Sequence, residues 1–326
     1  MMGGGQPMKN FAMTGVAGYV APRHLKAIRD TGNRLRVAVD PHDSVGVLDG
    51  FFPDVSYFRE FERFDRHVER LRRGDPNERI DYVTVCSPNY LHDAHVRLAL
   101  RVGADAICEK PLVLNPWNLD ALQELERETG RRVYTILQLR LHPALMALHA
   151  ATEQEPPGTR HDVSLTYITP RGPWYQHSWK GDLDKSGGIA TNIGIHFFDL
   201  LLWVFGKVRQ SALHLVDRDK AAGILELERA DVRWFLSIDR GDLPPDVVKR
   251  GRPSFRLLEI DGREVEFSEG FTDLHTRVYE SILAGHGFGI DESRPAIQLV
   301  HDLREKVPSG VTDALHSRLS HRADTP

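Results

Sequence analysis

Cysteine is scarce in this chain, with only Cys86 and Cys108 among 326 residues. Two cysteines cannot build the disulfide framework of a small secreted protein. Each ends a short apolar run, which predicts buried, reduced thiols and a cytoplasmic protein. The first eight residues (MMGGGQPM) also lack the basic and apolar regions of a signal peptide.

The chain also has no excess of positive charge. The net charge is -4 and the sequence pI is about 6.5, so no basic surface favours nucleic acid or an anionic membrane. No apolar run reaches the roughly 20 residues of a membrane span. Hydrophobic residues make up 41% and charged residues 27%, as in ordinary globular proteins, and the length suits two domains. We therefore expect a small-molecule partner, with no nucleic acid and no membrane.

Strands and helices alternate over residues 8–138. Apolar strands are expected at 9–14, 35–39, 81–86, 104–109 and 133–138, with helices at 22–30, 60–73, 92–102 and 116–130 between them. This alternation predicts an α/β domain with a parallel sheet and helices on both faces.

After Gln138 the pattern changes, and residues 139–326 are expected to form a second domain. Strands are expected at 161–168, 211–216, 224–228, 232–238, 255–260 and 264–267, with a hairpin turn at 261–262 and helices at 143–152, 272–283 and 295–306. These strands predict an open, mostly antiparallel sheet of α+β type. One face of that sheet is left over, so we expect self-association.

A glycine turn at residues 15–21 (GVAGYVA) separates the first strand from its helix. Turns need glycine in any case, but the next strand ends on Asp40, at the spacing of a carboxylate that binds a ribose. Asp40 would repel a 2'-phosphate and no arginine follows it directly, which favours NAD over NADP. The predicted cofactor-binding residues here are Gly15, Val16, Ala17, Gly18, Tyr19 and Asp40.

Two further motifs carry titratable groups. The fourth strand ends on Glu109-Lys110-Pro111, at the sheet edge where open parallel sheets bind ligands, so Lys110 could hold substrate or move a proton. The alternative is a surface ion pair. Residues 187–205 predict a helix with Asn192 and His196 on one face, where a histidine can transfer a proton and Asp199 could orient it. The alternative is an ordinary buried helix histidine.

Together these motifs resemble the Gfo/Idh/MocA oxidoreductases, over nearly the whole chain. The resemblance rests on the glycine turn, the acidic strand end, Ser87-Pro88-Asn89 with His92, Glu109-Lys110-Pro111 and the Gly-Gly helix. It implies a Rossmann domain followed by an open, mostly antiparallel sheet, with Lys110 and His196 acting on a sugar or cyclitol hydroxyl. The family commonly has aspartate where this chain has Asn192, which shifts proton transfer to His196 or Lys110. The implied cofactor contacts add Ser87, Asn89, His92, Glu109, Lys110 and Gln138.

Six local sequences narrow the resemblance to members that oxidise the C3' hydroxyl of UDP-N-acetyl-2-amino-2-deoxyglucuronate. They lie at 15–24, 86–92, 108–113, 167–175, 178–182 and 269–275. This resemblance implies a role in making a diaminouronic acid of bacterial surface polysaccharide (O-antigen or lipopolysaccharide), 2-oxoglutarate as a candidate hydride acceptor, and a homotetramer. A dehydrogenase of a free sugar or cyclitol stays open, as does a non-catalytic NAD-binding sensor, although a sensor would be expected to lack the lysine or the histidine.

A UDP-linked uronate would explain the composition of residues 167–182. Arg171 and Lys180 offer cations for a carboxylate or pyrophosphate, while Trp174, Tyr175 and Trp179 offer flat surfaces for sugar or uracil. The alternative is a solvated loop. With Lys110, Asn192 and His196 these form the predicted substrate site. His92 and His95 lie three residues apart, but no third ligand is near in the sequence, so no metal site is expected.

Overall fold

The computed structural model describes residues 7–267, 273–309 and 316–318. Residues 269–272 of the sixth local sequence therefore lie outside the described residues. The chain divides into two compact units. The first contains the residues up to Gln138 together with a later segment that ends at Ser293, and the second contains the rest of the chain. The expected boundary after Gln138 is where the chain leaves the first unit, but the return of the later segment was not predicted.

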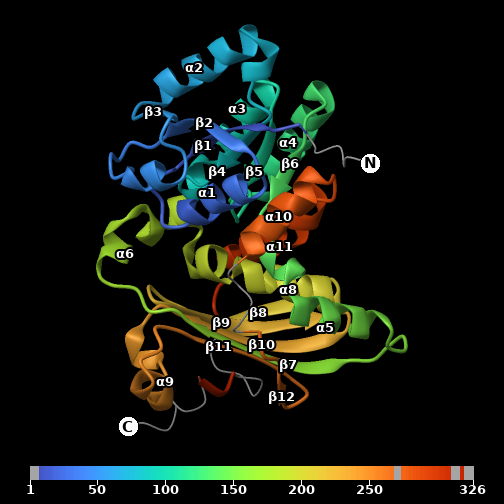
Figure 1. Cartoon of the computed structure of the whole chain (residues 1–326). Coiled ribbons are helices and arrows are strands. Elements are labelled where there is room, and N and C mark those ends of the chain that lie inside the picture. The colour runs from blue at the N-terminus through green and yellow to red at the C-terminus, as the bar shows by residue number, and fades with distance from the viewer. Residues whose placement is uncertain (1–6, 268–272, 310–315, 319–326) are drawn as a thin grey trace. The chain divides into compact units, whose positions relative to one another are not determined.

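The first unit contains a sheet of six parallel strands in the order β3-β2-β1-β4-β5-β6 (Figure 1). The strands are β1 (Asn10–Thr14), β2 (Arg34–Val39), β3 (Ser56–Phe58), β4 (Tyr82–Val85), β5 (Asp105–Cys108) and β6 (Val133–Thr135). This order is that of a Rossmann fold, so the predicted fold class is confirmed. The prediction missed β3, because its three residues form no apolar run.

The α-helices of the first unit each bury apolar residues. They are α1 (Ala21–Asp30), α2 (Phe61–Arg73), α3 (His92–Arg101), α4 (Pro116–Thr129) and α10 (Leu274–Leu283), with short 3-10 helices η1 (Gly46–Gly50), η2 (Pro76–Glu78) and η3 (Asn89–Leu91). In α1 the buried face includes His24, Leu25 and Ile28. The predicted helix start at residue 272 falls outside the described residues.

The second unit contains a six-stranded sheet in the order β12-β11-β7-β10-β9-β8. The strands are β7 (His161–Ile168), β8 (Val208–Val216), β9 (Lys220–Leu227), β10 (Ala230–Ser237), β11 (Phe255–Ile260) and β12 (Arg263–Glu264). Among the strands that the structure describes here, only β7 and β10 pair in parallel, so the sheet is mostly antiparallel, as predicted. The last strand ends at Glu264, and its predicted extension to Phe267 is wrong.

Both faces of this sheet carry helices. Phe198 of α8 (Ile195–Phe205) packs edge-on against Trp234, with ring centroids 5.2 Å apart. On the opposite face Val247 of α9 (Pro245–Lys249) joins a buried cluster with Phe235. The other helices are η4 (Gln138–Leu141), α5 (Pro143–Glu153), α6 (Trp174–His177), η5 (Trp179–Gly181), α7 (Leu183–Ser186), the π-helix η6 (Ala190–Gly194), η7 (Arg240–Asp242) and α11 (Ile290–Glu305).

Two helix predictions need correction. The expected continuous helix at 187–205 is a π-helical segment, η6, followed by α8. The helix expected from Pro295 begins at Ile290 instead, with Pro295 inside it at the loss of one backbone hydrogen bond. By length and composition alone, Leu183–Phe205 is apolar enough to cross a membrane. However, 72% of its most apolar part is buried inside the protein, as in the core helix of a globular protein.

Candidate functional site

The loops that follow β1 and β4 meet where the strand order of the first sheet reverses. Gly15 has a positive φ of 77°, and a Cβ there would lie 2.4 Å from the carbonyl carbon of Cys86 and 2.5 Å from the backbone nitrogen of Ser87. Only glycine fits this backbone. Rossmann sheets bind dinucleotides in the crevice at such a reversal, beside the N-terminus of the first helix, here α1.

Asp40 connects the end of β2 to this glycine loop. Its two carboxylate oxygens accept hydrogen bonds from the backbone N-H groups of Ala17 (3.0 Å) and His42 (2.9 Å). Each carboxylate oxygen has a second lone pair, so Asp40 retains acceptor capacity for a ribose hydroxyl. Tyr57 supports the turn by donating to the backbone carbonyls of Asp40 and His42.

The Ser87-Pro88-Asn89 turn is held by two buried histidines of α3. The Nδ1 of His95 lies 2.8 Å from the Ser87 hydroxyl and 3.1 Å from that of Thr14. His92 faces two backbone carbonyls, those of Pro111 (2.7 Å from Nδ1) and Ser87 (2.8 Å from Nε2). His92 thus joins this turn to the Glu109-Lys110-Pro111 turn.

The remaining predicted cofactor residues differ in exposure. Val16 is buried, Tyr19 is 88% exposed and Asn89 is 5% exposed. Gln138 follows β6, and its side-chain oxygen is buried without a hydrogen-bond partner among the described residues. A buried carboxamide oxygen needs a donor. The carboxamide of a nicotinamide could supply this donor. The crowded Gly15 backbone and Asp40 lie where a dinucleotide would need a close turn and a carboxylate. Gly15, Asp40 and Gln138 therefore fit NAD.

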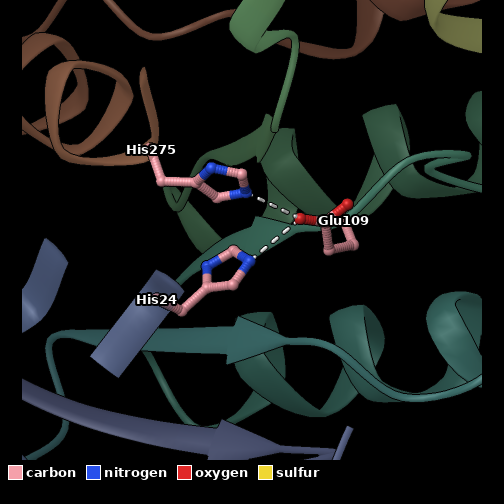
Figure 2. A group of neighbouring side chains, drawn as sticks. All are labelled: His24, Glu109 and His275. Atoms are coloured by element: carbon pink, nitrogen blue, oxygen red, sulfur yellow. Dashed lines mark hydrogen bonds and ion pairs between the residues drawn. The ribbon is translucent and has the colours of Figure 1, made fainter. Parts of the chain in front are cut away.

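Glu109 lies at the end of β5 and is surrounded by two further histidines (Figure 2). Its Oε1 atom lies 2.9 Å from Nε2 of His24 and 3.3 Å from Nε2 of His275, and its Oε2 atom accepts a 3.3 Å hydrogen bond from the backbone N-H of Lys110. Burial alone would raise the pKa of Glu109, but the hydrogen bonds from His24 and His275 outweigh it and hold the pKa well below the usual value.

This cluster also has the composition of a metal site. His24, Glu109 and His275 each offer one ligand atom, and the three atoms lie within 4.8 Å of one another. However, Nδ1 of His24 is already bonded to the Tyr279 hydroxyl at 2.8 Å, and that hydroxyl lies 2.9 Å from Thr84 Oγ1. Both histidine ligand atoms are bonded to the Glu109 carboxylate, so the described residues form a hydrogen-bonded network that extends to Thr84.

The second unit carries the predicted residues of the Gly-Gly helix. Asn192 and His196 are partly exposed, while the three residues between them are buried, so both side chains belong to one stripe of this helix. Asn192 lies in η6, and its Nδ2 donates a 2.7 Å hydrogen bond to the hydroxyl of Tyr175. Single π-helical turns occur frequently at functional sites, because they change which side chains share a face.

The aromatic segment before this helix encloses a lysine. The Lys180 ammonium lies 4.8 Å from the ring centroid of Trp174 and 4.9 Å from that of Trp179. Burial, and then the charge of Arg171, lower the pKa of Lys180. Tyr175 differs from expectation: it is 2% exposed, so it supports Asn192 through its hydroxyl and offers no open ring surface.

Several residues without a predicted role are connected to these motifs in the structure. Arg140 makes two hydrogen bonds, of 2.6 and 3.0 Å, to the carboxylate of Asp199, and both side chains are at least 90% buried. In the first unit His24, His275 and Tyr279 were missed. All three are far from Glu109 in the sequence, so no local spacing could have connected them to it.

Comparison with protein families matches both units. The model of the Gfo/Idh/MocA oxidoreductase family's NAD-binding Rossmann fold matches residues 9–137, and that of its C-terminal alpha/beta domain matches residues 160–304. Among curated proteins, inositol 2-dehydrogenase from Rhizobium meliloti is 28% identical over 146 residues, which cover 44% of this chain and 43% of that protein. The chain therefore aligns with less than half the length of this relative.

Solved structures match over almost the full length. A WlbA (WbpB) dehydrogenase from Thermus thermophilus, in complex with NAD and alpha-ketoglutarate, is 52% identical with a TM-score of 0.91, covering 95% of this chain and 99% of that chain. A structure of this Thermus enzyme with NAD and UDP-GlcNAcA gives 51% identity, a TM-score of 0.91 and the same coverage. The WlbA dehydrogenase from Bordetella pertussis, at 19% identity and a TM-score of 0.73 over 93% of this chain and 97% of that chain, shares the fold.

Proposed function

Because the chain belongs to the Gfo/Idh/MocA oxidoreductase family, we propose that it oxidises the C3' hydroxyl of UDP-N-acetyl-2-amino-2-deoxyglucuronate (UDP-GlcNAcA) to a ketone with NAD. The observation that carries this proposal is the 51–52% identity, over 95% of the chain, to an enzyme whose structures contain NAD, UDP-GlcNAcA and alpha-ketoglutarate. The crowded Gly15 loop and Asp40 support the cofactor, as does the buried Gln138 oxygen, which has no hydrogen-bond partner in the described part of the chain.

When bound, NAD accepts the hydride that leaves C3' of the sugar. The chain must take the hydroxyl proton and polarise the oxygen. We assign these two tasks to His196 and Lys110, since an imidazole and an ammonium are the side chains suited to them. Asn192, held by Tyr175, has an amide that can orient a substrate hydroxyl but cannot act as a base.

Arg171 and Lys180 supply the positive charge of the proposed substrate site. The Lys180 ammonium lies close to two indole rings and is partly removed from water, which strengthens its attraction to a carboxylate or pyrophosphate. Trp174, which is 56% exposed, retains open ring surface for a sugar or uracil.

The wider proposal places the enzyme in the cytoplasm, as a homotetramer, in the synthesis of a diaminouronic acid for surface polysaccharide. The free, buried Cys86 and Cys108 support a reducing compartment. We propose 2-oxoglutarate as the hydride acceptor that restores NAD. Light scattering at micromolar concentration tests the assembly, because a monomer there would contradict a tetramer.

Ligand-dependent melting tests the substrate class. A ligand that binds only the folded protein raises the melting temperature. With NAD present, UDP-GlcNAcA should raise it and UDP should raise it less, while free glucuronate and myo-inositol should have no effect. Stabilisation by a free sugar or cyclitol, with none from UDP compounds, would contradict the proposed substrate but not the proposed cofactor.

A further inference from the structure

The donors and acceptors around Glu109 can be assigned from one end of the network to the other. Glu109 is ionised, so its oxygens only accept, and Nε2 of His24 must donate to Oε1. Burial lowers the pKa of His24 and keeps the ring neutral, so Nδ1 carries no proton and accepts from the Tyr279 hydroxyl. Tyr279 in turn accepts from the Thr84 hydroxyl. Each of these buried groups has a partner with the right polarity.

His275 adds a second donor to the same carboxylate oxygen. Its Nε2 atom lies 3.3 Å from Oε1, its ring meets that of His24 edge-on at 5.0 Å, and both rings are less than 10% exposed. With Oε1 occupied by two imidazoles and Oε2 bonded to the backbone N-H of Lys110, the carboxylate is fixed at both oxygens. A fixed Glu109 side chain constrains the backbone at the residue before Lys110.

The two histidines come from different parts of the first unit, as Figure 2 shows. His24 lies on α1, which follows the glycine loop, and His275 lies on α10, which the chain reaches only after passing through the second unit. We propose that His24 and His275 are positioning residues for Lys110, which they hold in place by donating to Glu109. This inference rests on the proposed function, because it presumes that Lys110 acts on the substrate.

The first test compares two substitutions at His275. Among the described contacts His275 has a polar bond to Glu109 alone, so its replacement leaves the Thr84–Tyr279–His24 chain intact. His275→Leu removes the donor, whereas His275→Gln keeps an N-H. We expect His275→Leu to lower kcat by roughly ten- to a hundredfold through displacement of Lys110, and His275→Gln to recover most of the loss.

A readout independent of activity separates this inference from the proposed function. Hydrogen exchange of the peptide that covers residues 108–114 should be faster in His275→Leu than in the wild type and near normal in His275→Gln. His316→Gln is the matched control: it alters another buried histidine bonded to hydroxyls, those of Ser164 and Thr166, and should change neither the exchange of this peptide nor kcat.

The outcomes are distinct. Unchanged exchange and unchanged kcat in His275→Leu would overturn the positioning role. If exchange is faster in His275→Leu but the wild-type protein does not oxidise UDP-GlcNAcA, the histidines still hold Glu109 and the proposed function is wrong. One equivalent of zinc in the purified wild-type protein, lost in His275→Leu, would overturn the hydrogen-bonded assignment in favour of a metal site.

Discussion

The Nε2 atom of His24 lies 2.9 Å from Oε1 of Glu109, so the helix that begins at the glycine loop is bonded directly to the strand end that precedes Lys110. A hydrogen bond within the first unit therefore links the helix after the glycine loop to the residue that precedes the proposed catalytic lysine. Substitutions there should separate effects on cofactor binding from effects on turnover.

Gly15→Ala should abolish measurable NAD binding, because its Cβ would collide with the backbone at Cys86 and Ser87. Gly32→Ala is the control: Gly32 has a similar φ of 74°, but apart from its chain neighbours no atom of the described residues lies within 4 Å of the added Cβ. That variant should lose only about 1 kcal/mol of stability and bind NAD normally. Titration with NAD measures both, and tight binding by Gly15→Ala would contradict the assigned loop.

Asp40→Ala should weaken NAD binding at least about tenfold and reduce the preference for NAD over NADP, since it removes a charged acceptor and the repulsion of a 2'-phosphate. The neighbouring Asp43, whose side chain is 74% exposed, provides the control. Dissociation constants for both dinucleotides should be unchanged in Asp43→Asn. An unaltered preference in Asp40→Ala would show that another residue selects the cofactor.

Lys110→Met and His196→Asn should each lower kcat by at least about a hundredfold while NAD still binds, because general acid-base catalysis supplies factors of that size. Single-turnover absorbance near 340 nm measures hydride transfer directly. Near-normal turnover in both variants would show that the proton is taken elsewhere.

Asp199→Asn should lower the free energy of unfolding by about 3 kcal/mol, because it removes the negative charge of a carboxylate that is buried against the Arg140 guanidinium. Glu69→Gln is the control for burial. Glu69 binds Arg72 through both carboxylate oxygens, as Asp199 binds Arg140, but this pair lies at the surface of α2. Urea unfolding should show little change in Glu69→Gln. Equal losses in the two variants would mean that burial does not set the strength of these pairs.

Stability should fall as the solution is acidified below pH 6.5. Burial lowers the pKa of His95 to about 4 from 6.5, so the unfolded chain binds a proton that the folded protein excludes over this interval. The stabilisation is complete above pH 6.5 and is lost as the pH falls toward 4, by about 2 kcal/mol at pH 5 for this residue. His95→Gln should therefore show a shallower decline between pH 7 and 5 in urea titrations than the wild type.

Much of the fold followed from the sequence because each signal was local. The apolar run at residues 9–14, the glycine turn and Asp40 lie within about 30 residues, and their order predicts the Rossmann unit. β3 was missed because three half-buried residues give no periodic signal. The π-helix was missed because α- and π-helical turns have similar apolar patterns, and the difference depends on packing.

The site was predictable only in part, for a related reason. Lys110 and His196 stand in motifs that are contiguous in the sequence. The partners of Glu109 are contributed by α1 and α10, 85 and 166 residues away along the chain. Tyr175 was expected to contact substrate, but aromatic composition alone does not tell a buried ring from an open one.

The most direct test of the proposed reaction follows the hydrogen on C3' of the sugar. UDP-GlcNAcA with deuterium at C3' is incubated with the enzyme, NAD and 2-oxoglutarate, and the products are analysed by mass spectrometry. We predict a 3-keto sugar without deuterium and 2-hydroxyglutarate with deuterium at C2. If the deuterium is found in NADH alone, the dehydrogenase activity is supported and 2-oxoglutarate is not the hydride acceptor. An unchanged UDP-sugar, with its deuterium still at C3', would contradict the proposed function.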